Sequence, residues 1–420
     1  MKNSARHVLL ASLIGTTIEF FDFYIYANAA VLVFPTLFFP ASNSITLMLQ
    51  SLATFSVAFF ARPIGSVFFG HFGDRVGRKA TLVASLLTMG ISTIIIGCLP
   101  TYESIGLLAP LLLILCRFGQ GFGLGGEWGG AILLAVENAP PHKKAWYGMF
   151  PQLGAPIGLL MSGGIFLILS DSLTNAEFFR FGWRIPFIAS SLLIIVGLYI
   201  RFTIQETPVF LASAKNIKHK HLPVTTILKK YLRELVLGTL IAVATFVLFY
   251  LTTVFTLGWA TNELGLARRD LLIMQLFSVL FFALFIPISA FLADRFNRHI
   301  ILMLASFLIA CFGLAMAPML NTHNSSTIIF FLSIGMALMG LTYGPLGTML
   351  SDLFPTYVRY TGTSLTFNLA GILGASFAPF IALWMATHYG IHYVGYYLSL
   401  AALISLYSLA LTKNKSTHSF

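Results

Sequence analysis

The sequence predicts an all-α polytopic membrane protein, with twelve transmembrane helices arranged as two six-helix bundles. Three observations support this fold class. Only 9% of the 420 residues are charged, 57% are hydrophobic and 40 are phenylalanine, a composition that soluble globular proteins do not have. Apolar stretches of about 20 residues, the length that crosses a bilayer, recur along the whole chain. The two halves of the chain also share one loop pattern, described below.

The predicted helices follow one another with short connections, except for one longer basic loop in the middle of the chain. We therefore expect an N-terminal bundle at 1–203, a central loop at 204–233 and a C-terminal bundle at 234–420. The twelve apolar stretches lie near 9–34, 46–70, 80–100, 105–134, 145–170, 184–203, 235–259, 270–292, 300–319, 326–351, 362–386 and 393–412.

The distribution of lysine and arginine predicts that both termini and the central loop are cytoplasmic. On this helix map, 19 of the 25 basic residues lie in the termini and the loops on the same side, whereas four lie in the opposite loops. Basic residues concentrate on the cytoplasmic side of membrane proteins. A basic face against anionic lipid also accounts for the net charge of +11 without a nucleic-acid partner.

Five charged residues lie inside predicted helices, namely Glu19, Asp22, Arg62, Arg117 and Glu127. A charge at bilayer depth is costly, and by default it indicates an ion or substrate pathway. Arginine stays charged in proteins, so two arginines against three acids leave one carboxyl group without a partner. That group is free to carry a proton. The count is therefore the first indication of proton coupling.

Depth along the helices predicts which of these charges meet. At 1.5 Å per residue, Asp22 lies roughly 21 Å from the cytoplasmic end of its helix and Arg117 roughly 18 Å from the outer end of its own. We therefore expect Asp22 to pair with Arg117, and Arg62 to pair with Glu19 or Glu127. A substrate anion that reaches the arginine would compete for it and leave the carboxylate free to take a proton. The alternative is that these are static ion pairs that set helix packing.

A repeated loop pattern indicates that the chain is a tandem duplication. Residues 70–79 read GHFGDRVGRK, and residues 292–299 read LADRFNRH, a degraded copy about 220 residues later. Such repeats relate transporter halves by a pseudo-two-fold axis along the membrane normal. We expect a cytoplasmic gate of weak ion pairs and helix-terminus contacts. The predicted gate residues are Gly70, Asp74, Arg75, Gly77, Arg78, Lys79, Glu137, Asp294, Arg295, Arg298, Asp352 and Arg359.

The first loop pattern resembles the signature of the major facilitator superfamily, and seven further segments resemble its metabolite:proton symporter family. This resemblance implies a bacterial inner-membrane protein whose relatives move α-ketoglutarate, citrate, shikimate, or proline and betaine together with protons. The segments occur in order from the first to the eleventh helix, at residues 15–24 (GTTIEFFDFY), 61–65 (ARPIG), 117–121 (RFGQG), 125–130 (GGEWGG), 182–187 (GWRIPF), 206–210 (ETPVF) and 353–362 (LFPTYVRYTG).

The charges and the resemblance together predict proton-coupled uptake of a small carboxylate-bearing metabolite by alternating access. We expect a monomer that binds its substrate, protons and lipid, without a metal, a cofactor or an enzymatic activity. A proline/betaine-type osmolyte symporter is the main alternative, and a drug:proton antiporter or a non-transporting sensor is less favoured. The predicted proton-coupling residues are Asp22, Glu19, Arg117 and Glu127, and the predicted substrate-binding residues are Arg62, Arg117, Tyr24, Gln120 and Gln152.

Overall fold

The computed structural model describes residues 5–40, 44–75, 78–203, 223–321 and 324–412. These residues are mostly helical, and there is no strand among them. Eleven helical stretches are long and apolar enough to cross a membrane. The longest of them, Arg269–Leu320, has 52 residues and contains two helices, α15 and α16. The described chain therefore makes twelve crossings, which confirms the predicted fold class.

The first six crossings form the N-terminal half of the molecule. Short helices join them, namely α2 (Phe34–Phe38), α5 (Tyr102–Ile105), η1 (Pro141–Lys143), α9 (Asn175–Glu177) and η2 (Phe178–Gly182). The crossings are α1 (Ala5–Leu32), α3 (Ser44–Arg75), α4 (Arg78–Cys98), α6 (Leu108–Leu124) continued by α7 (Trp128–Glu137), α8 (Lys144–Ser172) and α10 (Arg184–Thr203).

The other six crossings form the C-terminal half, which follows a short helix, α12 (Pro223–Lys230). In this half, the seventh and eleventh crossings of the chain each contain a π-helical turn, η3 and η5 respectively. Such turns often occur at functional sites. The crossings are α13 (Leu232–Tyr250) continued by η3 (Leu251–Phe255) and α14 (Thr256–Asn262), α15 (Arg268–Leu292) followed by η4 (Ala293–Asn297), α16 (Arg298–Leu320), α17 (Ser325–Asp352), α18 (Arg359–Gly371) continued by η5 (Ile372–Ser376) and α19 (Ala378–Tyr389), and α20 (Ile391–Thr412).

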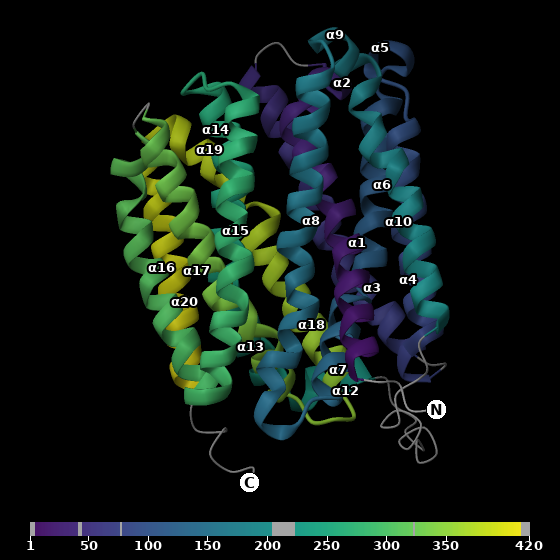
Figure 1. Cartoon of the computed structure of the whole chain (residues 1–420), viewed down its shortest axis with the longest axis vertical. Coiled ribbons are helices and arrows are strands. Elements are labelled where there is room, and N and C mark those ends of the chain that lie inside the picture. The colour runs from purple at the N-terminus through teal and green to yellow at the C-terminus, as the bar shows by residue number, and fades with distance from the viewer. Residues whose placement is uncertain (1–4, 41–43, 76–77, 204–222, 322–323, 413–420) are drawn as a thin grey trace.

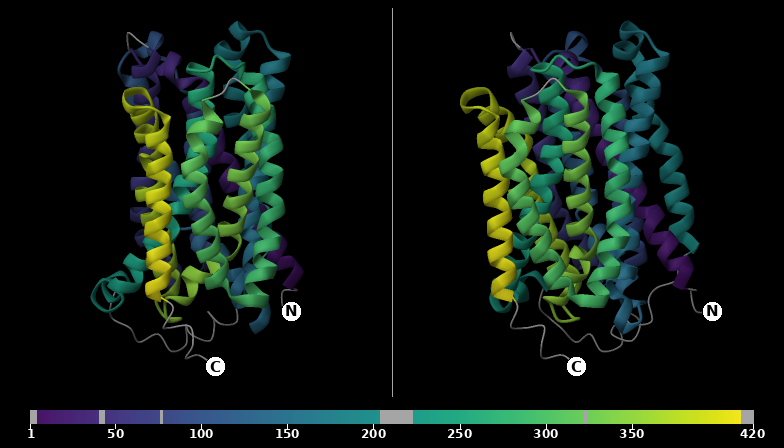
Figure 2. Two further views of the ribbon diagram at one scale, coloured as in Figure 1. Left: turned by 90° about the vertical axis from the view of Figure 1, so that its left-hand side faces the viewer. Right: turned by 60° about the vertical axis from the view of Figure 1, so that its left-hand side comes forward.

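The two halves stand side by side with their helices roughly parallel to the long axis of the molecule (Figures 1 and 2). The described chain begins and ends at the same end of this bundle, which we call the terminal face. The other end is called the opposite face. Odd-numbered crossings therefore run from the terminal face to the opposite face, and even-numbered crossings return.

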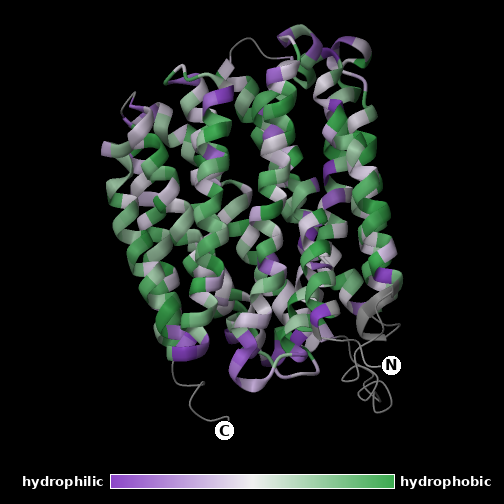
Figure 3. Cartoon of the chain, in the orientation of Figure 1, coloured by the Kyte–Doolittle hydropathy of each residue, from purple (hydrophilic) through white to green (hydrophobic). Residues whose placement is uncertain are grey.

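The outer surface of the bundle is suited to lipid. Large apolar side chains such as Leu115, Ile195 and Leu314 are exposed on it, and hydrophobic residues cover most of the length of the helices (Figure 3). Hydrophilic residues gather toward the two ends. A surface of this kind is stable only where hydrocarbon replaces water over the middle of the helices. The protein is therefore a multi-pass membrane protein.

Close packing between the backbones of α3 and α6 sets the position of Arg62 on α3. A β-carbon added to Gly121 would lie 2.2 Å from the carbonyl oxygen of Ala58, and one added to Gly125 would lie 2.0 Å from that of Arg62. Small residues allow membrane helices to approach this closely. The close approach of the fourth crossing thus holds the backbone of Arg62 against it.

Candidate functional site

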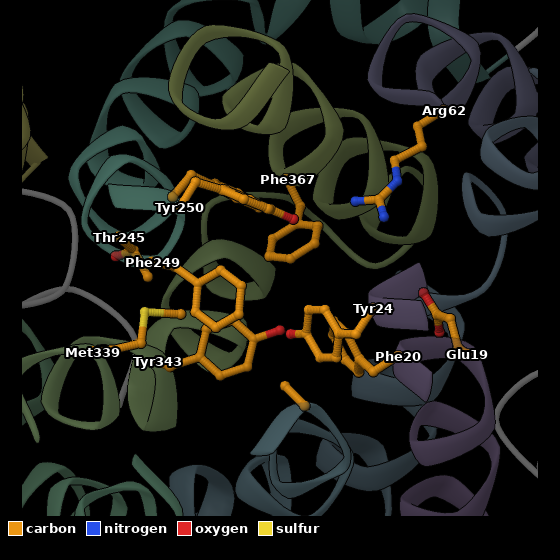
Figure 4. A pocket seen from close by; sticks show the side chains of 12 residues that line it. Glu19, Phe20, Tyr24, Arg62, Thr245, Phe249, Tyr250, Met339, Tyr343 and Phe367 are labelled. Atoms are coloured by element: carbon orange, nitrogen blue, oxygen red, sulfur yellow. The ribbon is translucent and has the colours of Figure 1, made fainter. Parts of the chain in front are cut away.

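A cavity, which we call the central cavity, lies between the two halves (Figure 4). Its empty space is about 450 Å³, spread among the side chains that line it. The charged residues in this lining are Glu19 and Arg62, both from the N-terminal half, while the C-terminal half supplies mainly aromatic rings. The lining residues are Glu19, Phe20, Tyr24, Arg62, Ala155, Thr245, Phe246, Phe249, Tyr250, Met339, Tyr343 and Phe367.

Arg62 is the buried cation of the cavity, as the sequence predicts. Its side chain points from α3 into the cavity (Figure 4), and the residue is only 5% exposed. The guanidinium carbon lies 4.4 Å from the ring centroid of Phe23 and 4.8 Å from that of Phe59. Its Nε atom has no hydrogen-bond partner among the described residues. Ring contacts only partly offset the burial of a charge, so the site can accept an anionic group.

Arg117 lies behind the cavity wall, not on it as expected. Its guanidinium carbon also lies 4.4 Å from the ring centroid of Phe23, and it lies 3.9 Å from that of Tyr26. Its Nη1 atom donates a hydrogen bond to Oε1 of Gln120 at 2.9 Å. Arg117 is fully buried and is not among the cavity-lining residues, and neither is Gln120. Both arginines therefore contact the ring of Phe23, but of the two only Arg62 lines the cavity.

The predicted ion pair between Asp22 and Arg117 is not formed. The Ser190 hydroxyl of α10 donates to Oδ1 of Asp22 at 2.6 Å, and Oδ2 has no partner within the described part of the chain. The Thr93 side chain lies beside the same carboxylate and accepts a hydrogen bond from the Gln120 amide at 2.7 Å. Thr93 and Gln120 thus connect Asp22 to Arg117 indirectly. Equal depth along two helices did not guarantee contact, because the side chains leave their helices in different directions.

Glu127 pairs with Arg201, a residue that is not among the five charges predicted to lie inside the helices. Arg201 is buried at the end of α10, where it forms an ion pair with Glu127 and donates to the carbonyl oxygen of Leu82. The predicted alternative of a pair between Glu127 and Arg62 is therefore wrong. With Arg201 included, three buried arginines stand against the three predicted acids, so that comparison no longer leaves a surplus carboxyl group. Glu234, near the start of α13, is a fourth buried acid among the described residues. The sequence did contain one indication that Arg201 could lie in the core, because position 201 falls inside the predicted span 184–203.

Glu19 enters the cavity whereas Asp22 does not. Residues three apart on a helix differ by about 60° in direction, and this difference turns Glu19 toward the cavity and Asp22 toward α10. Glu19 is 4% exposed, and its Oε2 atom has no hydrogen-bond partner in the described structure. Tyr24 lines the cavity as expected.

On the terminal face, Asp294 joins the two halves. Its carboxylate accepts hydrogen bonds from the backbone N–H groups of Ala145 and Trp146, at 2.9 and 2.8 Å. These N–H groups belong to the first turn of α8, so a negative charge meets the positive end of a helix dipole. Asp294 lies in the C-terminal half and α8 in the N-terminal half. This contact is therefore of the helix-terminus kind expected for the gate.

The other predicted gate residues divide into three groups. Arg298 pairs with Asp352 at 2.6 Å, but both belong to the C-terminal half, and Arg359 donates to the Phe354 carbonyl at 3.0 Å within its own segment. Gly70 packs against α18, where an added β-carbon would lie 3.4 Å from the Thr361 hydroxyl. Arg295 lies in the middle of η4, and Glu137 is the last residue of α7. Gly77 and the side chains of Asp74, Arg75, Arg78 and Lys79 lie outside the described residues.

A second layer of contacts closes the space between the cavity and the terminal face. The Asn368 amide of α18 donates to the Ser66 hydroxyl at 2.6 Å, and the Tyr360 hydroxyl donates to the Gly126 carbonyl. Both contacts join the C-terminal half to α3 or to the break between α6 and α7. The cavity is therefore separated from the terminal face by hydrogen bonds that must break if this side opens.

Gln152 belongs to this closing layer and does not line the cavity. Its amide donates to the Tyr343 carbonyl at 2.8 Å and its oxygen accepts from the Trp128 indole at 2.9 Å. The Trp128 ring in turn stacks on Phe367, with centroids 3.6 Å apart and planes inclined by 8°. Gln152 thus links the two halves, whereas the sequence predicts it to bind substrate.

Comparisons with known proteins agree with this architecture. The chain is 56% identical to the inner membrane metabolite transport protein YhjE of Escherichia coli (strain K12), over 98% of this chain and 94% of that protein. It is 36% identical to the shikimate transporter of the same strain, over 98% and 95% of the two chains. It is also 30% identical to the proline/betaine transporter of that strain, over 96% of this chain and 82% of that protein.

A solved structure shares the fold at low sequence identity. The proton:xylose symporter XylE bound to 6-bromo-6-deoxy-D-glucose superposes with a TM-score of 0.76 and 16% identity, over 98% of this chain and 95% of that one. The family description "Major Facilitator Superfamily" matches residues 12–375, which is most of the chain. The chain therefore belongs to the major facilitator superfamily.

Proposed function

We propose that the protein takes up a small carboxylate-bearing metabolite together with protons, by alternating access. Keto acids, dicarboxylates, tricarboxylates and shikimate are the substrates of this class that we favour. The observation that carries the proposal is Arg62, a buried cation that lines the central cavity and forms no ion pair within the described structure. A substrate carboxylate would supply the missing negative charge.

The chemistry of the cavity supports a substrate with one charged end and a compact apolar body. Arginine binds carboxylates through charge-assisted hydrogen bonds, often two at once. The opposite wall carries the rings of Phe249, Tyr250 and Tyr343, which would pack against carbon atoms of the substrate. Shikimate, proline and betaine, the compounds named for two relatives, all carry a carboxylate. The named substrates thus share the group that Arg62 would bind.

Alternating access would use the contacts between the halves. The terminal face is the side on which basic residues concentrate in the sequence, so we assign it to the cytoplasm. In the conformation described here, Asp294, Asn368 and Tyr360 hold this side closed. Release of substrate to the cytoplasm would require the two halves to rotate apart at these contacts.

We propose that Asp22 carries the coupled proton. It is fully buried and has no ion pair among the described residues, so a proton would remove an uncompensated charge. An anion at Arg62 would change the electrostatic field at Arg117, because both guanidinium groups lie 4.4 Å from the centroid of Phe23. Arg117 is connected to Asp22 through two bridging side chains. Substrate and proton binding would thereby influence each other.

A zwitterionic osmolyte is the second candidate, and the position of Glu19 favours it. Glu19 and Arg62 line the same cavity, so one end of a zwitterion could meet each charge. Tyr24 and Tyr250 lie in the same lining, and aromatic rings bind ammonium groups through cation–π contacts. Proline and betaine both have this charge arrangement.

Uptake into proteoliposomes with an imposed inward proton gradient tests the proposal. We expect the wild type to accumulate at least one compound from a panel of keto acids, citrate, shikimate, proline and betaine. Arg62→Gln should lower kcat/KM by at least about 100-fold, because two hydrogen bonds from a charged group, at about 1.5–3 kcal/mol each, are lost. Arg233→Gln, an exposed cation outside the cavity, is the matched control and should transport normally.

Two outcomes would decide against parts of the proposal. Full uptake by Arg62→Gln would remove the cavity arginine from substrate binding. A loss of uptake in Glu19→Gln that is limited to proline and betaine would assign the cavity to zwitterions.

A further inference from the structure

We propose that an anionic phospholipid binds with its head group in a groove on the terminal face, between α8 and α15, and holds the two halves together there. The binding itself rests on the groove alone. Its effect on transport rests on the function proposed above. The groove shares no lining residue with the central cavity.

The groove is formed where the N-terminal half meets the C-terminal half. It has an empty volume of about 1000 Å³ and is lined by residues from η1 and the first turn of α8 on one side and from the end of α15 and η4 on the other. α8 and α15 stand next to each other on the near side of the bundle in Figure 1. The lining residues are His142, Lys143, Trp146, Phe291, Asp294 and Arg295.

The charges of this groove are unbalanced. Asp294 is its acid, and both carboxylate oxygens already accept backbone hydrogen bonds from α8. Lys143 and Arg295 are both exposed, and neither forms an ion pair with any residue that the structure describes. The two cations come from different halves. An anionic group placed between them would be attracted by both, and it would bridge the halves beside the contact of Asp294.

The surroundings of the groove favour a lipid over a soluble anion. Trp146 and Phe291 are exposed at its edge, by 36% and 52%, and aromatic side chains are typical of the membrane–water interface. Leu284 and Ile288 continue from Phe291 along one face of α15, and both are exposed. Their spacing of four and three residues places them in one stripe. This stripe would carry an acyl chain into the bilayer while the phosphate stays at the cations.

Basic pockets between transmembrane helices on the cytoplasmic side are known to bind anionic head groups. Here the head group would lie across the joint that opens during transport. Bound lipid would favour the conformation in which the terminal face is closed, because Lys143 and Arg295 move apart when the halves separate. A bilayer rich in anionic lipid would therefore stabilise this conformation relative to a zwitterionic bilayer.

Native mass spectrometry of the purified full-length protein tests the proposal. Phosphatidylglycerol and phosphatidylcholine with identical acyl chains are compared as ligands. We expect the wild type to retain phosphatidylglycerol preferentially. Lys143→Gln combined with Arg295→Gln should weaken this retention by about 30-fold, the fold-change for two cations at ~1 kcal/mol each. Lys229→Gln combined with Lys230→Gln removes two exposed cations of α12 outside the groove and should retain the lipid.

A charge-preserving variant, Lys143→Arg with Arg295→Lys, separates loss of charge from loss of structure, and it should retain phosphatidylglycerol. Three results would overturn the proposal. One is equal retention of the two lipids by the wild type. Another is an equal loss of lipid in the α12 control. The third is displacement of phosphatidylglycerol by excess inorganic phosphate, which would indicate a soluble-anion site. None of these measurements requires transport, so they stand apart from the tests of the proposed function.

Discussion

Replacing Asp294 with asparagine should shift the protein toward conformations in which the terminal face is open. Asp294 accepts two backbone hydrogen bonds from the first turn of α8, at 2.9 and 2.8 Å, across the joint between the halves. Asparagine offers one oxygen in place of two and carries no charge. The change removes a contact that exists only while this face is closed, and it leaves the size of the side chain almost unchanged.

The expected magnitude follows from the contact that is lost. A hydrogen bond to a charged group contributes about 1.5–3 kcal/mol, and asparagine can keep only one of the two. The interaction of the charge with the helix terminus is lost as well, at about 0.3–1 kcal/mol for an exposed site. Using the hydrogen-bond term alone, the ratio of closed to open conformations should fall by about 10- to 150-fold.

Distances between spin labels across the terminal face can measure this ratio. Suitable positions are Asn138, exposed at the end of α7, and Tyr407, exposed on α20. The native free cysteines, Cys98, Cys116 and Cys311, would first be replaced so that only the introduced labels react. We expect the fraction of long distances to rise in Asp294→Asn relative to the same labelled background.

Asp352→Asn is the matched control. Asp352 lies on the same face and has an ion pair of 2.6 Å, but its partner, Arg298, belongs to the same half. Loss of this pair should therefore leave the distance distribution unchanged. The reasoning would be refuted if Asp294→Asn kept the wild-type distribution, or if Asp352→Asn opened the face to the same extent.

Three further predictions follow from buried groups. Asp22→Asn should abolish proton-driven accumulation of substrate but retain exchange of substrate across the membrane, as measured by counterflow; accumulation at the wild-type level would exclude Asp22 as the proton carrier. Glu127→Gln should destabilise the purified protein by about 3–5 kcal/mol, because it leaves Arg201 charged and unpaired, and combining it with Arg201→Gln should recover part of this loss in thermal unfolding. Gly121→Val should sharply reduce the yield of folded protein, since even a β-carbon would lie 2.2 Å from a backbone oxygen, whereas Gly164→Val, with no atom within 4 Å, should not; equal yields of the two variants would contradict the packing argument.

The arrangement of the helices was largely predictable. The apolar length of each crossing is a local property, and the twelve predicted spans agree with the helices of the structure to within a few residues, as for α10 at Arg184–Thr203. The breaks inside the fourth, seventh and eleventh crossings were not predicted. They depend on packing against neighbouring helices, and an apolar stretch looks the same with or without a π-helical turn.

The contacts of the buried charges were less predictable. Glu19, Arg62 and Tyr24 line the cavity as expected, because a charged or polar residue at bilayer depth must face the protein interior. Arg201 is not among the predicted core charges, because its position near the end of a span does not reveal whether its long side chain reaches solvent or turns inward. In the structure it turns inward to Glu127. A side chain at a helix end has both options, and only the neighbouring helix decides between them.

The sequence by itself determined the membrane environment, the twelve crossings, the superfamily and five of the charged residues in the core. These follow from composition, from the length of apolar stretches and from short motifs, all of which are local. Only the tertiary structure decided that Asp22 meets Ser190 instead of Arg117, that Arg62 alone of the two predicted arginines enters the cavity, and that Asp294 joins the halves. The physical reason is that a sequence specifies how deep a residue lies along its helix, whereas the rotation and packing of the helices specify which neighbour it meets.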